Sequence, residues 1–171
     1  MKKLIFSFLL VLSCFSICNA EAIYDTSERN INGTIYYEAY VFDRFDEANI
    51  ILQIGKAGFD GIVGEPRMYF YKINIVQAAP ATINVKELTL MSEIDSITIP
   101  EQFFKNKHRQ SGTDLTVDTI GYNGDPGRVN VVIDSIVNKM VIKIKTSDNK
   151  IYTLHPSQDF IAGLKKVAKW S

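Results

Sequence analysis

The side chains that most often carry chemistry are sparse in this sequence. It contains two histidines, His108 in a polar basic segment and His155 beside Pro156. Two histidines bind zinc or exchange protons together only when their rings meet in space. The chain has no G-x-S-x-G, H-E-x-x-H or phosphate-loop pattern. We therefore expect no metal and no cofactor, and we interpret the histidines as one solvated and one strand-end side chain.

Acidic side chains offer a second route to chemistry. Asp43, Asp46 and Glu47 form the densest acidic cluster, and Asp125 lies in a turn rich in Gly and Asn. Oxygen ligands of this kind can hold calcium, although their spacing is not that of an EF-hand. Two carboxylates from separate strands can also hydrolyse glycosidic bonds, because such a pair is defined by distance and not by a motif. We interpret these acids as solvated loop side chains.

A glycine-rich segment gives the candidate binding residues. Residues 55–66 contain four of the ten glycines, so we expect a loop, yet they also include Phe59, Ile62 and Val63. Apolar side chains in a loop usually return to the core and pack there. The alternative is a binding loop in which Phe59, Ile62 and Val63 contact a partner.

Tyrosines gather in the N-terminal half of the chain. An exposed row of tyrosines can bind a glycan or a protein, whereas a half-buried sheet explains the same residues without a ligand. The tyrosines concerned are Tyr24, Tyr36, Tyr37, Tyr40, Tyr69 and Tyr71.

The first 20 residues have the layout of an export signal. Two lysines precede an apolar run at residues 4–12, and a segment of mostly small residues ends at Ala20. We expect cleavage between Ala20 and Glu21, in a style typical of bacteria. The apolar run is much shorter than the ~20 residues of a spanning helix. In the alternative, residues 11–14 loosely resemble a lipoprotein box, and Cys14 would carry the lipid.

The amino-acid composition limits the kinds of partner that we expect the chain to bind. The chain has 19 basic and 19 acidic residues, and removal of residues 1–20 takes away Lys2 and Lys3 but no acid. The mature formal charge is therefore −2, which gives no electrostatic reason to expect nucleic acid or an anionic membrane surface. Both cysteines, Cys14 and Cys18, lie in the signal. The mature domain must be stable without a disulfide, and we expect no transmembrane segment in it.

Alternating apolar and polar residues dominate the rest of the chain. We expect about eight strands, at residues 34–42, 49–54, 67–76, 82–91, 114–120, 128–133, 140–146 and 151–154, with a short β-like segment at 96–99. The alternation at residues 82–91 slips in phase, so a β-bulge near Lys86 and Glu87 would keep Ile83, Val85, Leu88 and Leu90 on one face.

The C-terminal segment contains the one helix that the pattern predicts. Ser157 is placed to cap it, and an apolar face extends from Phe160 to Ala168. Residues 21–33 and 105–113 are polar, and we expect an irregular arm and a loop there. Together these features predict one mainly β domain over residues 21–171. Its architecture is an antiparallel β-sandwich or partly open barrel with a C-terminal amphipathic helix.

These observations favour a non-enzymatic, exported domain, periplasmic or secreted, that binds another macromolecule. An inhibitor, an immunity protein or an envelope-assembly factor has this character, and the partner is a protein or an envelope polymer. The alternatives are a hydrolase of envelope polymer with a carboxylate pair and a structural component of the envelope. Convergence of acids from distant strands in one cleft would favour the hydrolase.

Overall fold

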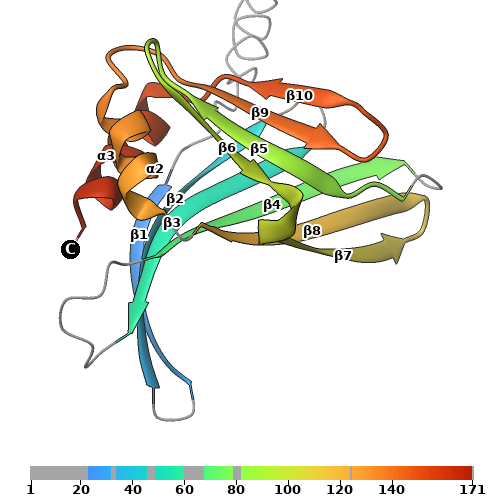
Figure 1. Ribbon diagram of the computed structural model, residues 1–171. Helices are drawn as coiled ribbons and strands as arrows, with labels where there is room; N and C mark the ends of the chain where they lie inside the picture. Colours follow the sequence, from blue (N-terminus) through green and yellow to red (C-terminus); the bar gives the residue numbers. More distant parts are fainter. Residues whose placement is uncertain are drawn as a thin grey trace, which may run out of the picture.

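The computed structural model describes residues 23–31, 34–45, 49–59, 68–78, 82–123 and 125–170. This part of the chain forms two antiparallel sheets of six and four strands, two α-helices and a short 3₁₀ helix (Figure 1). The predicted class, a mainly β protein with antiparallel sheets and a C-terminal amphipathic helix, is confirmed.

The larger sheet has the strand order β1-β2-β3-β4-β8-β7. Its strands are β1 (Ile23–Ile31), β2 (Thr34–Phe45), β3 (Ile50–Phe59), β4 (Met68–Ala78), β7 (Phe104–Ser111) and β8 (Asp114–Asn123). The sheet twists strongly, so that β1, β2 and β3 run at a steep angle to β8 and β7 in Figure 1.

The smaller sheet has the order β10-β9-β5-β6. Its strands are β5 (Val85–Met91), β6 (Ser96–Pro100), β9 (Val141–Thr146) and β10 (Ile151–Leu154). The helices are η2 (Glu101–Phe103), α2 (Pro126–Asp134) and α3 (Gln158–Lys169). The predicted bulge is present, because the register of β5 and β9 shifts between Val85 and Glu87. As a result the predicted set of Ile83, Val85, Leu88 and Leu90 is buried.

The described residues contain ten strands, more than the expected eight, because two polar segments and the short segment at 96–99 are strands, while 128–133 is not. The expected N-terminal arm contains β1, which pairs with β2, and the expected loop at 105–113 contains β7, which pairs with β8. The sequences of these two edge strands are mainly polar and charged, and so they lack the alternation that identifies a half-buried strand. Both segments take their conformation from pairing with a neighbour.

Two further expectations are wrong. The segment at 128–133 belongs to helix α2, because Asp125 caps it by accepting a bond from the Arg128 N–H (3.0 Å) and Pro126 occupies its first turn. A short apolar run alone cannot distinguish a strand from a buried helix. The expected loop from Gly55 starts later, since β3 continues to Phe59.

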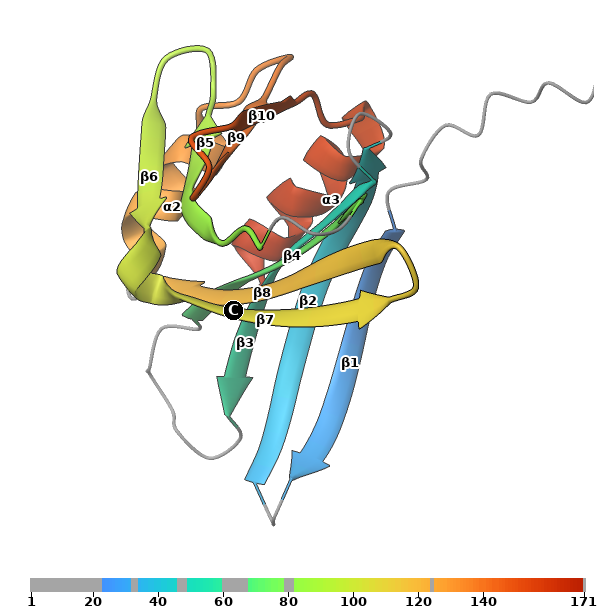
Figure 2. The same ribbon diagram turned by 90° about the vertical axis from the view of Figure 1, so that its right-hand side faces the viewer.

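One hydrophobic core fills the space between the sheets. The four-stranded sheet is narrower than the six-stranded one, and α3 packs on β1, β2 and β3 beside it (Figure 2). Helix α3 buries Phe160, Ile161, Leu164 and Val167 there. The predicted cap is also present, because the Ser157 Oγ accepts a bond from the Phe160 N–H (3.1 Å). The core side chains and helix α3 together thus cover the inner face of the large sheet.

Each end of α3 meets a buried charged side chain from the sheet. At its N-terminus Asp43 of β2, only 3% exposed, accepts a bond from the Ser157 N–H (3.2 Å). At its C-terminus Lys56 of β3, 6% exposed, donates from its Nζ to the carbonyl oxygens of Ala168 (2.5 Å) and Trp170 (3.4 Å). The signs of both charges complement the helix dipole, and their bonds satisfy backbone groups that the helix cannot pair itself.

Side chain–backbone bonds join the two sheets along one edge. The Asn106 Oδ1 of β7 accepts bonds from the Val85 N–H (2.9 Å) and the Thr119 hydroxyl (2.6 Å). Two residues further along β7, the His108 Nε2 lies 2.8 Å from the carbonyl oxygen of Ile83. These bonds hold β5 against the edge of the larger sheet and so fix the sheets relative to each other.

The turn between β5 and β6 holds both ends of α2. The Glu93 carboxylate accepts bonds from the backbone N–H groups of Val137 (3.0 Å), Asn138 (2.7 Å) and Lys139 (2.7 Å). Asp95 forms a two-bond ion pair with Arg128 in the first turn of α2. The N–H groups, that of Asn138 first, lower the pKa of Glu93 from its ordinary 4.5 to about 2.

Replacement of Lys56 by Met tests the bond at the C-terminus of α3. Met keeps most of the side-chain volume but leaves the Ala168 carbonyl without this donor. We expect a loss of about 1–3 kcal/mol in the free energy of unfolding, measured by urea denaturation. Lys143→Met on the exposed face of β9 is the matched control and should change stability little. An unchanged or raised urea midpoint in Lys56→Met would show that the bond does not stabilise the fold.

A second prediction concerns acid stability. Because the pKa of Glu93 is lower in the folded protein, its stabilising contribution is present above pH 4.5 and is lost as the pH falls towards 2. Glu93→Gln should therefore melt below the wild type at pH 7, and the difference between the two melting temperatures should shrink from pH 4.5 to pH 2. A difference that stays constant over this range would contradict the assignment.

Candidate functional site

The two histidines have separate surroundings in the described part of the chain. His108 bonds to a backbone carbonyl in the seam between the sheets, whereas His155 is an exposed residue between β10 and α3. No group of three or more His, Cys, Asp or Glu side chains there lies close enough to share a metal ion.

Asp43, the one member of the predicted acidic cluster that lies within the described residues, is not a solvated loop acid. Burial raises the pKa of Asp43, and hydrogen bonds from the backbone N–H groups of Ser157 and Arg44 oppose that rise. Asp125 caps α2. Asp46 and Glu47 lie outside the described residues. The two acids that the structure places therefore stabilise helix N-termini and do not converge on each other.

The structure describes only one of the three candidate binding residues. Phe59 is the last residue of β3, whereas Ile62 and Val63 lie outside the described residues. Cys14, Ala20 and Glu21 also lie outside them. The binding loop and the processing site remain predictions from the sequence.

The tyrosines of β4 belong to the core and form no exposed row. Tyr69 and Tyr71 are completely buried. The Tyr69 hydroxyl donates to the Asn130 Oδ1 of α2 (2.5 Å), and burial raises its pKa well above its ordinary value. Tyr69 therefore joins the large sheet to α2 and is not available to a ligand.

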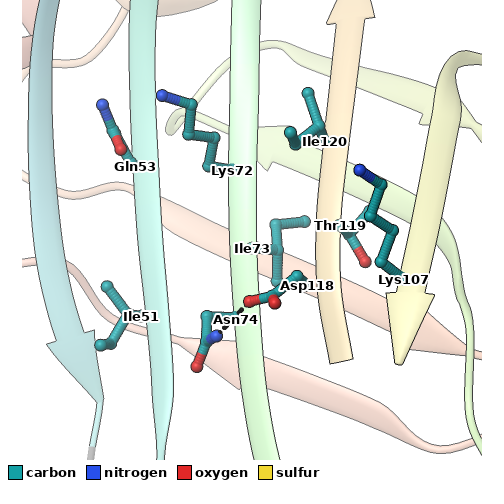
Figure 3. A pocket seen from close by; sticks show the side chains of 9 residues that line it. All are labelled: Ile51, Gln53, Lys72, Ile73, Asn74, Lys107, Asp118, Thr119 and Ile120. Carbon is teal, nitrogen blue, oxygen red and sulfur yellow. Dashed lines mark hydrogen bonds between the residues drawn. The ribbon is translucent and has the colours of Figure 1, made fainter. Parts of the chain in front are cut away.

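A different feature is concave and accessible: a hollow of about 340 Å³ on the outer face of the six-stranded sheet. We use "outer face" for the side that is turned away from α3 and the small sheet. The hollow crosses β3, β4, β8 and β7 (Figure 3). We call this site the outer hollow. The residues that line it are Ile51, Gln53, Lys72, Ile73, Asn74, Lys107, Asp118, Thr119 and Ile120.

Strand alternation places these side chains on the outer face, except those of Ile73 and Thr119, which are buried on the inner face. On β3, Ile50 and Leu52 are fully buried, while Ile51 and Gln53 between them are half-buried. The sequence pattern already separates Lys72 and Asn74 from the buried face of β4. Nothing in the pattern shows that β4 pairs with β8, because 35 residues separate these two strands in the chain. Sequence reasoning therefore missed the hollow, which exists only once the strands are paired.

Polar groups at the lower end of the hollow in Figure 3 are held in one network. The Asp118 carboxylate accepts from the Asn74 Nδ2 (2.5 Å) through Oδ1 and from the Arg109 Nε (2.6 Å) through Oδ2. Lys72 and Lys107 lie on either side of Ile120 in the same view. The hollow thus combines two aliphatic side chains, amides and ammonium groups with a single carboxylate that is already bonded.

The strands beside the hollow are packed closely. The ring of Phe70 on β4 lies over Gly55 on β3. A Cβ added at Gly55 would clash with this ring and would also lie 2.6 Å from the Ala39 carbonyl oxygen. The Lys72 Nζ lies 5.0 Å from the centre of the same ring, in the geometry of a cation–π contact. Gly55 therefore makes room for the Phe70 ring, and this ring in turn contacts the ammonium group of Lys72.

No helix within the described residues is long and apolar enough to cross a membrane. No protein-family model matches the chain, and no curated protein or solved structure matches it significantly.

Proposed function

We propose that this chain is an exported, non-enzymatic domain that binds another macromolecule on the outer hollow of its six-stranded sheet. Export rests on the signal layout of residues 1–20 and places the domain in the periplasm or outside the cell. Binding rests on the hollow.

The observation that carries the proposal is the difference between the two faces of the large sheet. The inner face is covered by α3 and the small sheet and is filled by the core. The outer face has a concave site where Ile51, Gln53 and Ile120 are half-buried, so a partner could bury them further. Concave sites with exposed aliphatic groups and a few polar groups are typical of binding sites.

The contents of the hollow favour binding over hydrolysis. A hydrolase of envelope polymer needs two carboxylates, one as acid and one as base or nucleophile. The outer hollow contains Asp118 alone, and Asn74 and Arg109 already bond to both of its oxygens. A carboxylate held in this way supports neighbouring side chains and is poorly placed to transfer protons.

Site-specific photo-crosslinking tests the proposal in cells that naturally encode the protein. The photoreactive residue p-benzoylphenylalanine replaces Gln53 in the full chain, and in a matched control it replaces Lys143 on the exposed face of β9. We expect a light-dependent adduct of one defined mass from position 53 and none from position 143. An adduct from neither position, or the same adducts from both, would contradict a binding site in the hollow.

A further inference from the structure

Lysines surround the aliphatic centre of the outer hollow. In the strand register, Ile120 of β8 pairs with Lys72 of β4 on one side and with Lys105 of β7 on the other. Lys107 lies two residues from Lys105 and therefore on the same face. Two strand spacings separate β4 from β7, which is about 10 Å. Ile120 thus lies between cationic side chains that are long enough to reach a ligand above it.

These lysines have no ion-pair partner among the described residues, in contrast to lysines near the smaller sheet. There, Lys145 pairs with Glu87 (3.3 Å) and Lys86 pairs with Glu101. A surface lysine beside an available carboxylate commonly forms such a pair. The outer hollow therefore concentrates positive charge that the fold itself does not neutralise, on a chain whose mature net charge is −2.

The carboxylate of Asp118, the one acid that lines the hollow, does not form an ion pair with these lysines. Asp118 is the direct cross-strand partner of Lys107, and such opposite charges usually attract each other. Its oxygens bond instead to Asn74 and, diagonally, to Arg109. Arg109 and Asn74 thereby leave the Lys107 ammonium group available to a ligand.

The lining also indicates the class of ligand. Nucleic acids and many glycans stack on aromatic side chains, and the outer hollow has none. Ile51 and Ile120 instead suit an aliphatic side chain, and the lysines suit carboxylates. In an extended chain, residues i, i+2 and i+4 share a face, and about 13 Å separates the first from the last. An aliphatic residue over Ile120 would then have acids within reach of the lysines on both sides.

We propose that the outer hollow binds an extended protein segment in which two acidic side chains flank an aliphatic one at positions i, i+2 and i+4. This inference rests on the proposed binding function and names the chemistry of its partner.

Fluorescence anisotropy, measured with the full chain, tests whether the outer hollow binds such a segment. The probe is a labelled, blocked heptapeptide, Ser-Glu-Thr-Leu-Thr-Glu-Ser. We expect saturable binding at low ionic strength, at least tenfold weakening by Lys107→Glu, and less than twofold change by Lys143→Glu, an exposed lysine of β9 with the same change of charge. A peptide with Ser in place of Leu should bind at least tenfold more weakly than the probe.

Four results would overturn the inference. Equal weakening by Lys107→Glu and Lys143→Glu would mean that net charge alone attracts the peptide. Tighter binding of inorganic polyphosphate than of the peptide, with the same loss in Lys107→Glu, would assign the site to an anionic polymer. Absence of peptide binding alongside a defined adduct at position 53 would reject the acidic segment while the binding function stands. Absence of both peptide binding and a defined adduct at position 53 would reject the proposed binding function and this inference together.

Discussion

Helix α3 lies between two buried charges that adjacent strands supply. Asp43 of β2 meets its N-terminus and Lys56 of β3 meets its C-terminus. A buried charge is costly unless hydrogen bonds and an opposite potential compensate it, and here the helix provides both. The amphipathic face of α3 is therefore held in one position along β2 and β3, and backbone groups at both of its ends are paired. The arrangement of the core follows from this position, since α3 covers the strands that the small sheet does not reach.

With the inner face of the large sheet covered, the outer face is the one that presents a concave surface to solvent. The same strands serve both faces: β3 contributes Lys56 to the helix and, by alternation, Ile51 and Gln53 to the outer hollow. Asn106 and its neighbours hold the edge of β7 against β5, which fixes the strand that carries Lys107. Structural roles and the proposed binding roles are thus divided between alternate residues of each strand, and the paired sheet positions the side chains of the hollow.

Local sequence patterns were sufficient for much of this fold but not for the candidate site. Alternation predicted most strands, the phase slip predicted the bulge at Lys86, and Ser157 predicted the start of α3. Strands β1 and β7 were missed because these two edge strands lack alternation, and α2 was missed because Asp125 and Pro126 outweigh a short apolar run. The burial of Asp43 depends on a helix more than 100 residues away, and the outer hollow depends on pairing between β4 and β8. Non-local contacts of this kind leave no trace in a local pattern.

Native-state hydrogen exchange measures most directly whether α3 belongs to the same cooperative unit as the sheet. Amide protons of a segment that opens only with the whole domain share the free energy of global unfolding, whereas a separately opening segment exchanges at lower cost. The two-ended attachment of α3 predicts that the slowest amides around Leu164 and Val167 exchange with the same free energy as those of Leu52 and Ile54 in β3. Exchange of α3 through a lower-energy opening of its own, with β3 still protected, would contradict this account.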